Sequence, residues 1–254
     1  MSEERSYTLA AELDKEMDTS ALYWNTRVPY DYIRFYRTPD GVQTVIVGGK
    51  DHEVGHGDAQ KSYQQLVSYT KEHFPVRSIL YSWSAQHYDS SDSLPLIGKS
   101  PFSSRYYIAT GFSGDGLVFG TAAGSIISDL ISGKENKFAD LYNPSRFKLS
   151  GITEFTHINL HNAEMLLEDR LKMGKDANKL SPDEASVSGG INPIAAYRDP
   201  DGNLYKRSAV CSHLHCMVRH NNAEKTWDCP CHGSRYTADG QIIEGPALKG
   251  LEEK

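Results

Sequence analysis

All four cysteines of this 254-residue chain lie in one short stretch, CSHLHCMVRHNNAEKTWDCPCHGSRY, residues 211–236. Cys211 and His213 form the pattern C-x-H, and Cys229 and His232 form C-x-x-H, with 15 residues between His213 and Cys229. Thiols of a cytosolic chain stay reduced, so cysteines clustered in this way indicate metal binding or redox chemistry more often than a disulfide scaffold. The fold must therefore bring these two short segments together.

The residue types in this stretch favour an inorganic centre. Each Cys/His pair can lie at the tip of a hairpin, so that two tips hold one centre from opposite sides. Thiolate and imidazole ligands together suit zinc, or iron in an iron–sulfur cluster. A centre with four ligands does not use the other two cysteines, Cys216 and Cys231, of which each segment contains one. From the residues alone, an iron–sulfur cluster, a structural zinc site and a plain disulfide scaffold all stay open.

The two segments CSHLHC and CPCHGSRY resemble the two cluster-binding loops of Rieske [2Fe-2S] proteins. In that family two cysteines hold one iron and two histidines hold the other. The resemblance implies that Cys211 and Cys229 are the thiolate ligands of a [2Fe-2S] cluster and that His213 and His232 are the imidazole ligands. A zinc site would not account for the second cysteine pair.

The same resemblance implies roles for further residues of the two loops. Cys216 and Cys231 match the disulfide that joins the loops in one branch of the family. Ser234 and Tyr236 match the hydroxyls that hydrogen-bond a bridging sulfide and a cysteine sulfur. One position departs from the pattern, because His215 stands where the family usually has glycine. A side chain at this tight turn would either strain the loop or shield the cluster.

The residues around the loops read as short strands. NPIAAYRD (192–199) and LYKRSAV (204–210) are joined by the turn signal PDGN, and YTADGQIIEGPAL (236–248) reads as a hairpin with Asp-Gly at its tip. Gly245-Pro246-Ala247 resembles the proline loop that covers the cluster in Rieske domains. We predict a small all-β Rieske domain over residues 176–254.

The most informative stretch of the first half is YYIATGFSGDGLVFGTAAGSIISDLISG, residues 106–133. A short apolar strand runs into a glycine-rich turn, and a helix with small residues on one face follows. Backbone N–H groups at a helix N-terminus attract negative charge. Such a turn is common in proteins and is weak evidence by its spacing alone. The carboxylate of Asp115 is a candidate cap for this helix.

Three segments together resemble FAD enzymes of the D-amino-acid oxidase and glycine oxidase type: ATGFSGDG (109–116), RFYRTPDGVQTVIVGG (34–49) and WSAQHYDSSDSLPLIG (83–98). The resemblance implies the C-terminal half of such a domain over residues 1–150, an α+β fold with an antiparallel sheet and helices. A connecting helix or linker over 151–175 follows. The flavin would be lined by Gly111, Phe112, Ser113, Gly114 and Gly116.

The G-x-G-x-x-G motif that binds the ADP half of FAD in this family does not occur in the opening residues. We therefore expect the chain to be the second half of a longer oxidoreductase, as a fragment or a truncated form. FAD belongs to the full-length relative, and we expect no tight FAD binding here. Whether this chain is itself an enzyme stays open.

The two halves together predict an iron–sulfur oxidoreductase that passes single electrons through a [2Fe-2S] cluster. In the full-length relative, the electrons would come from a flavin that oxidises an amine or amino acid. The alternative is an electron-carrier module whose first part only docks proteins and binds no flavin. The third hypothesis is an interaction domain that is stabilised by zinc.

Composition limits the partners. The formal net charge of −6 and the pI of about 5.9 give no basic surface for nucleic acid. No apolar run reaches the roughly 18 residues of a membrane-spanning helix, and the start MSEERSYTLA lacks the order of a signal peptide. We expect a cytoplasmic protein that exchanges electrons with a donor or acceptor protein or a quinone.

Overall fold

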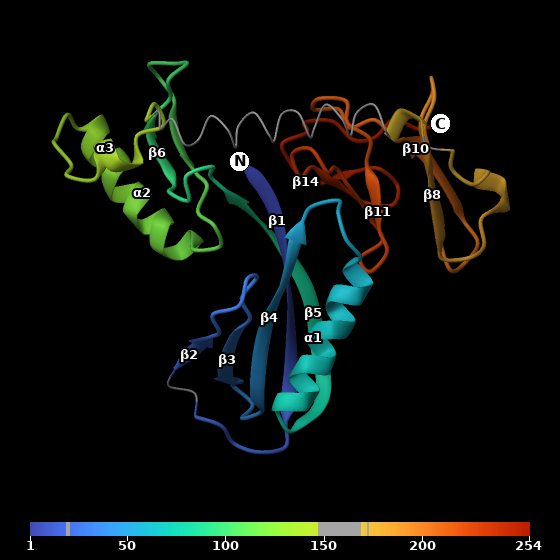
Figure 1. Cartoon of the computed structure of the whole chain (residues 1–254), viewed down its shortest axis with the longest axis horizontal. Coiled ribbons are helices and arrows are strands. Elements are labelled where there is room, and N and C mark those ends of the chain that lie inside the picture. Colours follow the sequence, from blue (N-terminus) through green and yellow to red (C-terminus); the bar gives the residue numbers. More distant parts are fainter. Residues whose placement is uncertain (19–20, 147–168, 172) are drawn as a thin grey trace. The chain divides into compact units, whose positions relative to one another are not determined.

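The computed structural model describes residues 1–18, 21–146, 169–171 and 173–254 (Figure 1). Two compact units form: one from Met1–Glu4 with His87–Glu164, the other from Arg5–Gln86 with Met165–Lys254. The connecting helix predicted within 151–175 lies for the most part outside the described residues. The predicted fold class, an α+β part followed by an all-β part, is confirmed.

A five-stranded sheet in the order β2-β3-β4-β1-β5 forms the framework of the first part. Its strands are β1 (Ser2–Leu13), β2 (Leu22–Trp24), β3 (Tyr32–Arg37), β4 (Gln43–Glu53) and β5 (Val76–Asp89). β3 pairs antiparallel with both β2 and β4. Nine of the 12 residues of β1 are buried, as is most of the first half of β4, so the apolar runs TLAAEL and TVIV occupy the centre of the sheet.

Helix α1 (Ala59–His73) follows β4 and packs on the sheet. Asp58 caps it, because its carboxylate accepts a hydrogen bond from the Lys61 backbone N–H at 3.1 Å. Leu66 is fully buried among Tyr7, Leu9 and Val47 of the sheet. The apolar face of α1 is the one that the sheet covers.

The unit that contains residues 87–146 holds the glycine-rich turn. β6 (Leu96–Lys99) and β7 (Tyr107–Thr110) form an antiparallel pair, and α2 (Gly116–Ile131) and α3 (Ala139–Tyr142) follow. Ile97, Ala123 and Ile126 form its small core. The capping role expected of Asp115 is wrong: the residue occupies the N-cap position, but its carboxylate makes no capping hydrogen bond.

The all-β part consists of two antiparallel sheets. The first has the order β10-β9-β8 and the second the order β11-β12-β13-β14. Their bounds are β8 (Glu184–Ser188), β9 (Ile194–Arg198), β10 (Leu204–Ser208), β11 (Arg219–Asn221), β12 (Thr226–Asp228), β13 (Arg235–Tyr236) and β14 (Ile242–Glu244), with a short 3-10 helix η1 at Ala177–Lys179. Trp227 and Tyr236 are paired across β12 and β13, and both are fully buried.

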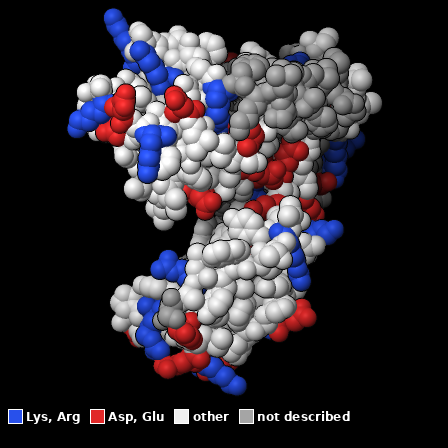
Figure 2. Space-filling view, turned by 60° about the vertical axis from the view of Figure 1, so that its left-hand side comes forward, with Lys and Arg blue, Asp and Glu red and all other residues white. Residues whose placement is uncertain are grey.

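Charged side chains of both signs lie on the face of the molecule that Figure 2 draws. Blue and red side chains are interspersed over the face drawn in Figure 2, and no broad basic area is visible on its described residues. Among the described residues, no helix has both the length and the apolar character needed to cross a bilayer.

Candidate iron–sulfur centre

The first Cys/His loop, Cys211–Cys216, lies just after β10. Two backbone hydrogen bonds close it: the Cys211 N–H donates to the Cys216 carbonyl at 2.9 Å, and the His215 N–H donates to the Cys211 carbonyl at 3.1 Å. His215 has a φ of +63°, in the left-handed region that favours glycine. The expected strain therefore falls on this residue, and the loop still takes the tight turn.

The second loop, Cys229–Ser234, joins β12 to β13 and is built in the same way. The Cys229 N–H donates to the Ser234 carbonyl at 2.8 Å, and the Gly233 N–H donates to the Cys229 carbonyl at 3.0 Å. Gly233 has a φ of +72°, which explains the glycine at that position. Each loop thus holds its Cys/His pair on a short turn closed at its base.

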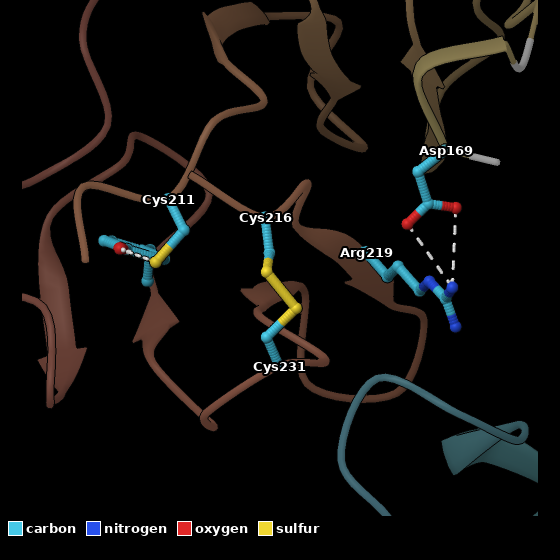
Figure 3. The surroundings of a disulfide bond; sticks show 6 residues. Asp169, Cys211, Cys216, Arg219 and Cys231 are labelled. Atoms are coloured by element: carbon cyan, nitrogen blue, oxygen red, sulfur yellow. Dashed lines mark hydrogen bonds and ion pairs between the residues drawn. A yellow bond between two sulfur atoms is a disulfide. The ribbon is translucent and has the colours of Figure 1, made fainter. Parts of the chain in front are cut away.

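A disulfide between Cys216 and Cys231 joins the two loops, as the resemblance implied (Figure 3). Both cysteines are buried. Figure 3 shows Cys211 to one side of this bond. The covalent tie keeps the two turns next to each other, and with them the residues expected to be ligands.

The thiols of Cys211 and Cys229 are buried and take no part in a disulfide. They share a hydrogen bond from Cys229 to Cys211, which lowers the pKa of the Cys211 thiol and, together with burial, raises the pKa of the Cys229 thiol. Two thiols at hydrogen-bond distance are placed to bind one metal ion between them once both are deprotonated.

The imidazole rings of His213 and His232 lie beside each other, with centroids 4.9 Å apart and planes at 88°. The Nδ1 atom of each ring is buried and has no hydrogen-bond partner among the described residues. Burial, and then the neighbouring His213, lower the pKa of His232, so that its ring favours the neutral form that binds metals. Buried polar atoms are seldom left without a partner, so these two nitrogens point to a missing ligand.

The four donors fit a [2Fe-2S] cluster. In the described part of the chain, no three His, Cys, Asp or Glu side chains gather around one point as the ligands of a single ion would. The donors form a thiol pair and an imidazole pair on adjoining loops. Two irons with unlike ligand pairs match this arrangement.

Two hydroxyls lie against the thiol pair. The Tyr236 hydroxyl is 3.1 Å from Cys211 Sγ, and burial raises the pKa of Tyr236, so the phenol keeps its proton and donates. The Ser234 hydroxyl accepts a hydrogen bond from the Ala247 N–H at 3.0 Å, and Ser234 is a minor cause of the lowered pKa of Cys211. Ser234 therefore connects the second loop to the Gly245-Pro246-Ala247 segment.

The glycine-rich turn forms as the sequence predicts, between β7 and the start of α2. Gly111, Ser113 and Gly114 all have positive φ values, of +75°, +49° and +86°. The Asp115 N–H donates to the Phe112 carbonyl at 2.8 Å, which closes the turn. A side chain added at Gly116 would meet nothing within 4 Å, so the N-terminus of α2 is accessible. The five candidate flavin contacts thus lie together at a helix N-terminus.

Sequence reasoning missed the buried polar residues of the sheet that lie against the cluster loops. Arg5 of β1 is only 1% exposed and is paired with Asp228, the residue before Cys229. Gly55 packs on Pro230 of the second loop so closely that an added Cβ would be 2.7 Å from the proline. These partners are more than 150 residues apart in the chain, and no local pattern connects them.

Comparison with known families agrees with both halves of this picture. A model for the FAD dependent oxidoreductase family matches residues 2–130, and a model for the Rieske [2Fe-2S] domain matches residues 171–253. A Bacillus subtilis protein named as a Rieske 2Fe-2S iron-sulfur protein, YhfW, is 33% identical over 258 residues. The iron-sulfur subunit of the cytochrome b6-f complex from Synechococcus sp. (strain JA-3-3Ab) is 52% identical over 48 residues.

Coverage limits what these relatives imply. The YhfW alignment spans 100% of this chain and 50% of that protein, so the chain spans half the length of that relative; the cytochrome subunit alignment covers 19% and 28%. Among solved structures, L-proline dehydrogenase from P. horikoshii reaches a TM-score of 0.43 at 23% identity, over 57% of this chain and 40% of that one. That likeness is too weak to carry an argument.

The family matches and the geometry of the two loops agree on the kind of protein. The oxidoreductase model alone matches half of the chain, and the Rieske model matches the part that holds all four cysteines. The chain therefore belongs to the FAD dependent oxidoreductase family and contains a Rieske [2Fe-2S] domain, which implies a [2Fe-2S] cluster and electron transfer.

Proposed function

We propose that Cys211 and Cys229 bind one iron of the [2Fe-2S] cluster and that His213 and His232 bind the other. The observation that carries the proposal is that two buried thiols and two buried, unpartnered Nδ1 atoms lie on loops joined by a disulfide. When bound, such a cluster takes up and releases one electron at a time. The Rieske domain extends over 176–254, after an oxidoreductase part at 1–150 and a linker at 151–175.

The surrounding residues hold and tune this centre. The disulfide keeps the two ligand loops together. The Tyr236 hydroxyl donates a hydrogen bond to the sulfur of Cys211, which disperses its negative charge, and the Ser234 hydroxyl hydrogen-bonds the bound cluster. The hydrogen bond from Ala247 to Ser234 keeps the Gly245-Pro246-Ala247 segment over the second loop and limits the access of water.

The electrons come, in the full-length relative, from a flavin that oxidises an amine or amino acid, and they leave to an acceptor protein or a quinone. The match to the FAD dependent oxidoreductase family and the accessible glycine-rich turn at the start of α2 support this. Gly111, Phe112, Ser113, Gly114 and Gly116 are the candidate flavin contacts. In this proposal the chain supplies one side of such a site.

A second candidate function is an electron-carrier module whose first part docks other proteins and binds no flavin. One observation favours it, because the Rieske part by itself resembles a dedicated electron-transfer protein: the iron-sulfur subunit of the cytochrome b6-f complex is 52% identical over 48 residues. The two candidates share the cluster and differ only in the source of its electrons. A flavin absorbance band in the purified protein would favour the enzyme.

The test is to purify the chain under oxygen-free conditions and to measure iron, acid-labile sulfide and the EPR spectrum after reduction. We expect about two irons and two sulfides per chain and a Rieske-type spectrum. The Cys211→Ser and His232→Ala variants should lose the cluster. Ser212→Ala, in the same loop, should keep it. Stoichiometric zinc without labile sulfide would refute the proposal.

A further inference from the structure

The guanidinium of Arg5 lies at the point where the five-stranded sheet meets the Rieske sheets. Nη1 donates to Ser84 Oγ at 3.1 Å and Nη2 donates to Gln86 Oε1 at 3.0 Å, both on β5. The same side chain forms ion pairs of 3.7 Å with Asp228 and with Glu244. Arg5 is 1% exposed and the Asp228 side chain 5%, so this ion pair is shielded from water, whereas the Glu244 side chain is 37% exposed.

The two carboxylates that Arg5 contacts lie next to the cluster site. Asp228 is the last residue of β12 and directly precedes Cys229. Glu244 is the last residue of β14 and directly precedes Gly245-Pro246-Ala247. A single side chain of the oxidoreductase part therefore holds the entry to the second ligand loop and the entry to the segment over it.

Gln86 extends this contact to the ligand loop itself. Its side chain lies against Gly233, the neighbour of His232, and a Cβ added at Gly233 would be 2.2 Å from Gln86 Nε2. Arg5 fixes the orientation of Gln86, because it donates to the Gln86 amide oxygen. The loop thus approaches the sheet as closely as a glycine allows.

A second charged group completes the contact. Arg235 pairs with both Glu224 and Asp228, and Glu224 also accepts hydrogen bonds from Ser84 and from the Tyr63 hydroxyl. In this cluster of charges, the guanidinium groups of Arg5 and Arg235 face the three carboxylates of Asp228, Glu224 and Glu244. Loss of Arg5 would leave one cation against three anions.

We propose that Arg5 is a positioning residue for the cluster, through which the oxidoreductase sheet holds the second ligand loop and raises the reduction potential. The inference rests on the proposed ligands. A reduced cluster carries one more negative charge, so the added negative field left by removal of Arg5 disfavours reduction. The fork of the guanidinium holds several partners at once, which a lysine ammonium cannot reproduce.

The experiment measures the cluster potential by voltammetry and the rate of iron release to a chelator in Arg5→Met, Arg5→Lys and Glu244→Gln. Arg37→Met is the matched control, because Arg37 is an exposed arginine of β3 that pairs with Glu16. We expect Arg5→Met to lower the equilibrium constant for reduction about tenfold, which is about 59 mV for one electron. Glu244→Gln should raise it, because an anion is removed.

Arg5→Lys separates charge from geometry. It should keep the equilibrium constant for reduction within about twofold of the wild type, while iron release becomes several-fold faster because the fork is lost. An Arg5→Met variant with wild-type potential and wild-type iron release would overturn the proposal. If Arg5→Met does not fold, Glu244→Gln decides, and an unchanged potential there overturns it. A wild type without a cluster would instead refute the proposed function.

Discussion

The Tyr236 hydroxyl lies 3.1 Å from the sulfur of Cys211, and both residues are buried. Tyr236 belongs to β13, in which its register partner on β12 is Trp227. The second ligand loop connects these two strands, so the sheet that forms the loop also places the hydroxyl against the sulfur. The pairing of the two strands therefore sets the position of the Tyr236 ring. Removing only the hydroxyl should leave the strands and the loop in place.

Tyr236→Phe removes this hydrogen bond without removing the ring. A hydrogen bond to a charged group contributes roughly 1.5–3 kcal/mol, and only the difference between the two oxidation states changes the potential. A differential of about 1.4 kcal/mol corresponds to about 59 mV for one electron. We expect the variant to have an intact cluster and a potential lower by several tens of millivolts. Voltammetry within about 10 mV of the wild type, small beside that interval, would contradict this.

Cys216→Ala and Cys231→Ala should each leave the cluster assembled but less durable. Neither sulfur is a proposed ligand, and the disulfide closes a loop with a sequence separation of 15. In the chain-entropy model, a disulfide that closes a loop of this length contributes about 3 kcal/mol to the free energy of unfolding. Iron and sulfide content after a gentle preparation should match the wild type, whereas iron release on heating should start at a lower temperature. Complete loss of iron from both variants at once would show that the ligands are misassigned.

The sequence predicted those parts of the molecule that depend on neighbours in the chain. The spacing around Cys211 and Cys229 and the Asp-Gly hairpin at 239–240 are local patterns, and the structure has both elements. Local preference also explains the error at Asp115, since a side chain can be of the capping type and still not reach the helix N–H groups.

The contacts between the sheet and the cluster loops could not be predicted in this way. In the sequence, Arg5 stands beside an apolar stretch, and nothing distinguishes it from a solvent-exposed charged residue. Only the tertiary fold brings Asp228 and Glu244 to it. Gly55 and Gly233 read as loop glycines, although each is also needed for close packing, against Pro230 and Gln86. Such pairs are set by long-range packing, for which a single sequence contains no periodic signal.

His215→Gly should stabilise the first ligand loop. The left-handed conformation costs an ordinary residue about 1–2 kcal/mol, and the greater freedom of glycine in the unfolded chain offsets roughly 0.5–1 kcal/mol of the gain. His215 is exposed and has a φ of +63°, so its replacement removes little packing. The matched control is His215→Ala, which keeps the Cβ in the strained conformation. Denaturant titrations should rank Gly above Ala; equal midpoints would show that the turn is not strained.

Acid should weaken the Rieske part through His220, whose ring stacks on Tyr197 and contacts Trp227 edge-on. Burial lowers the pKa of His220 from 6.5 to about 4. Between these pH values the unfolded chain binds a proton that the folded chain does not, so stability is complete above about pH 6.5 and falls as the pH drops towards 4. The full loss is at most about 3 kcal/mol.

His220→Phe keeps a ring between Tyr197 and Trp227 and cannot take up a proton. Its free energy of unfolding should therefore change less between pH 6.5 and 4 than that of the wild type, by up to the loss assigned to His220. Urea titrations at several pH values across this window measure the difference. The contributions of other titrating groups to the pH dependence are the same in both proteins and cancel in the comparison. Parallel curves for the two proteins would mean that the ring of His220 is protonated in the folded state, against the effect of its burial.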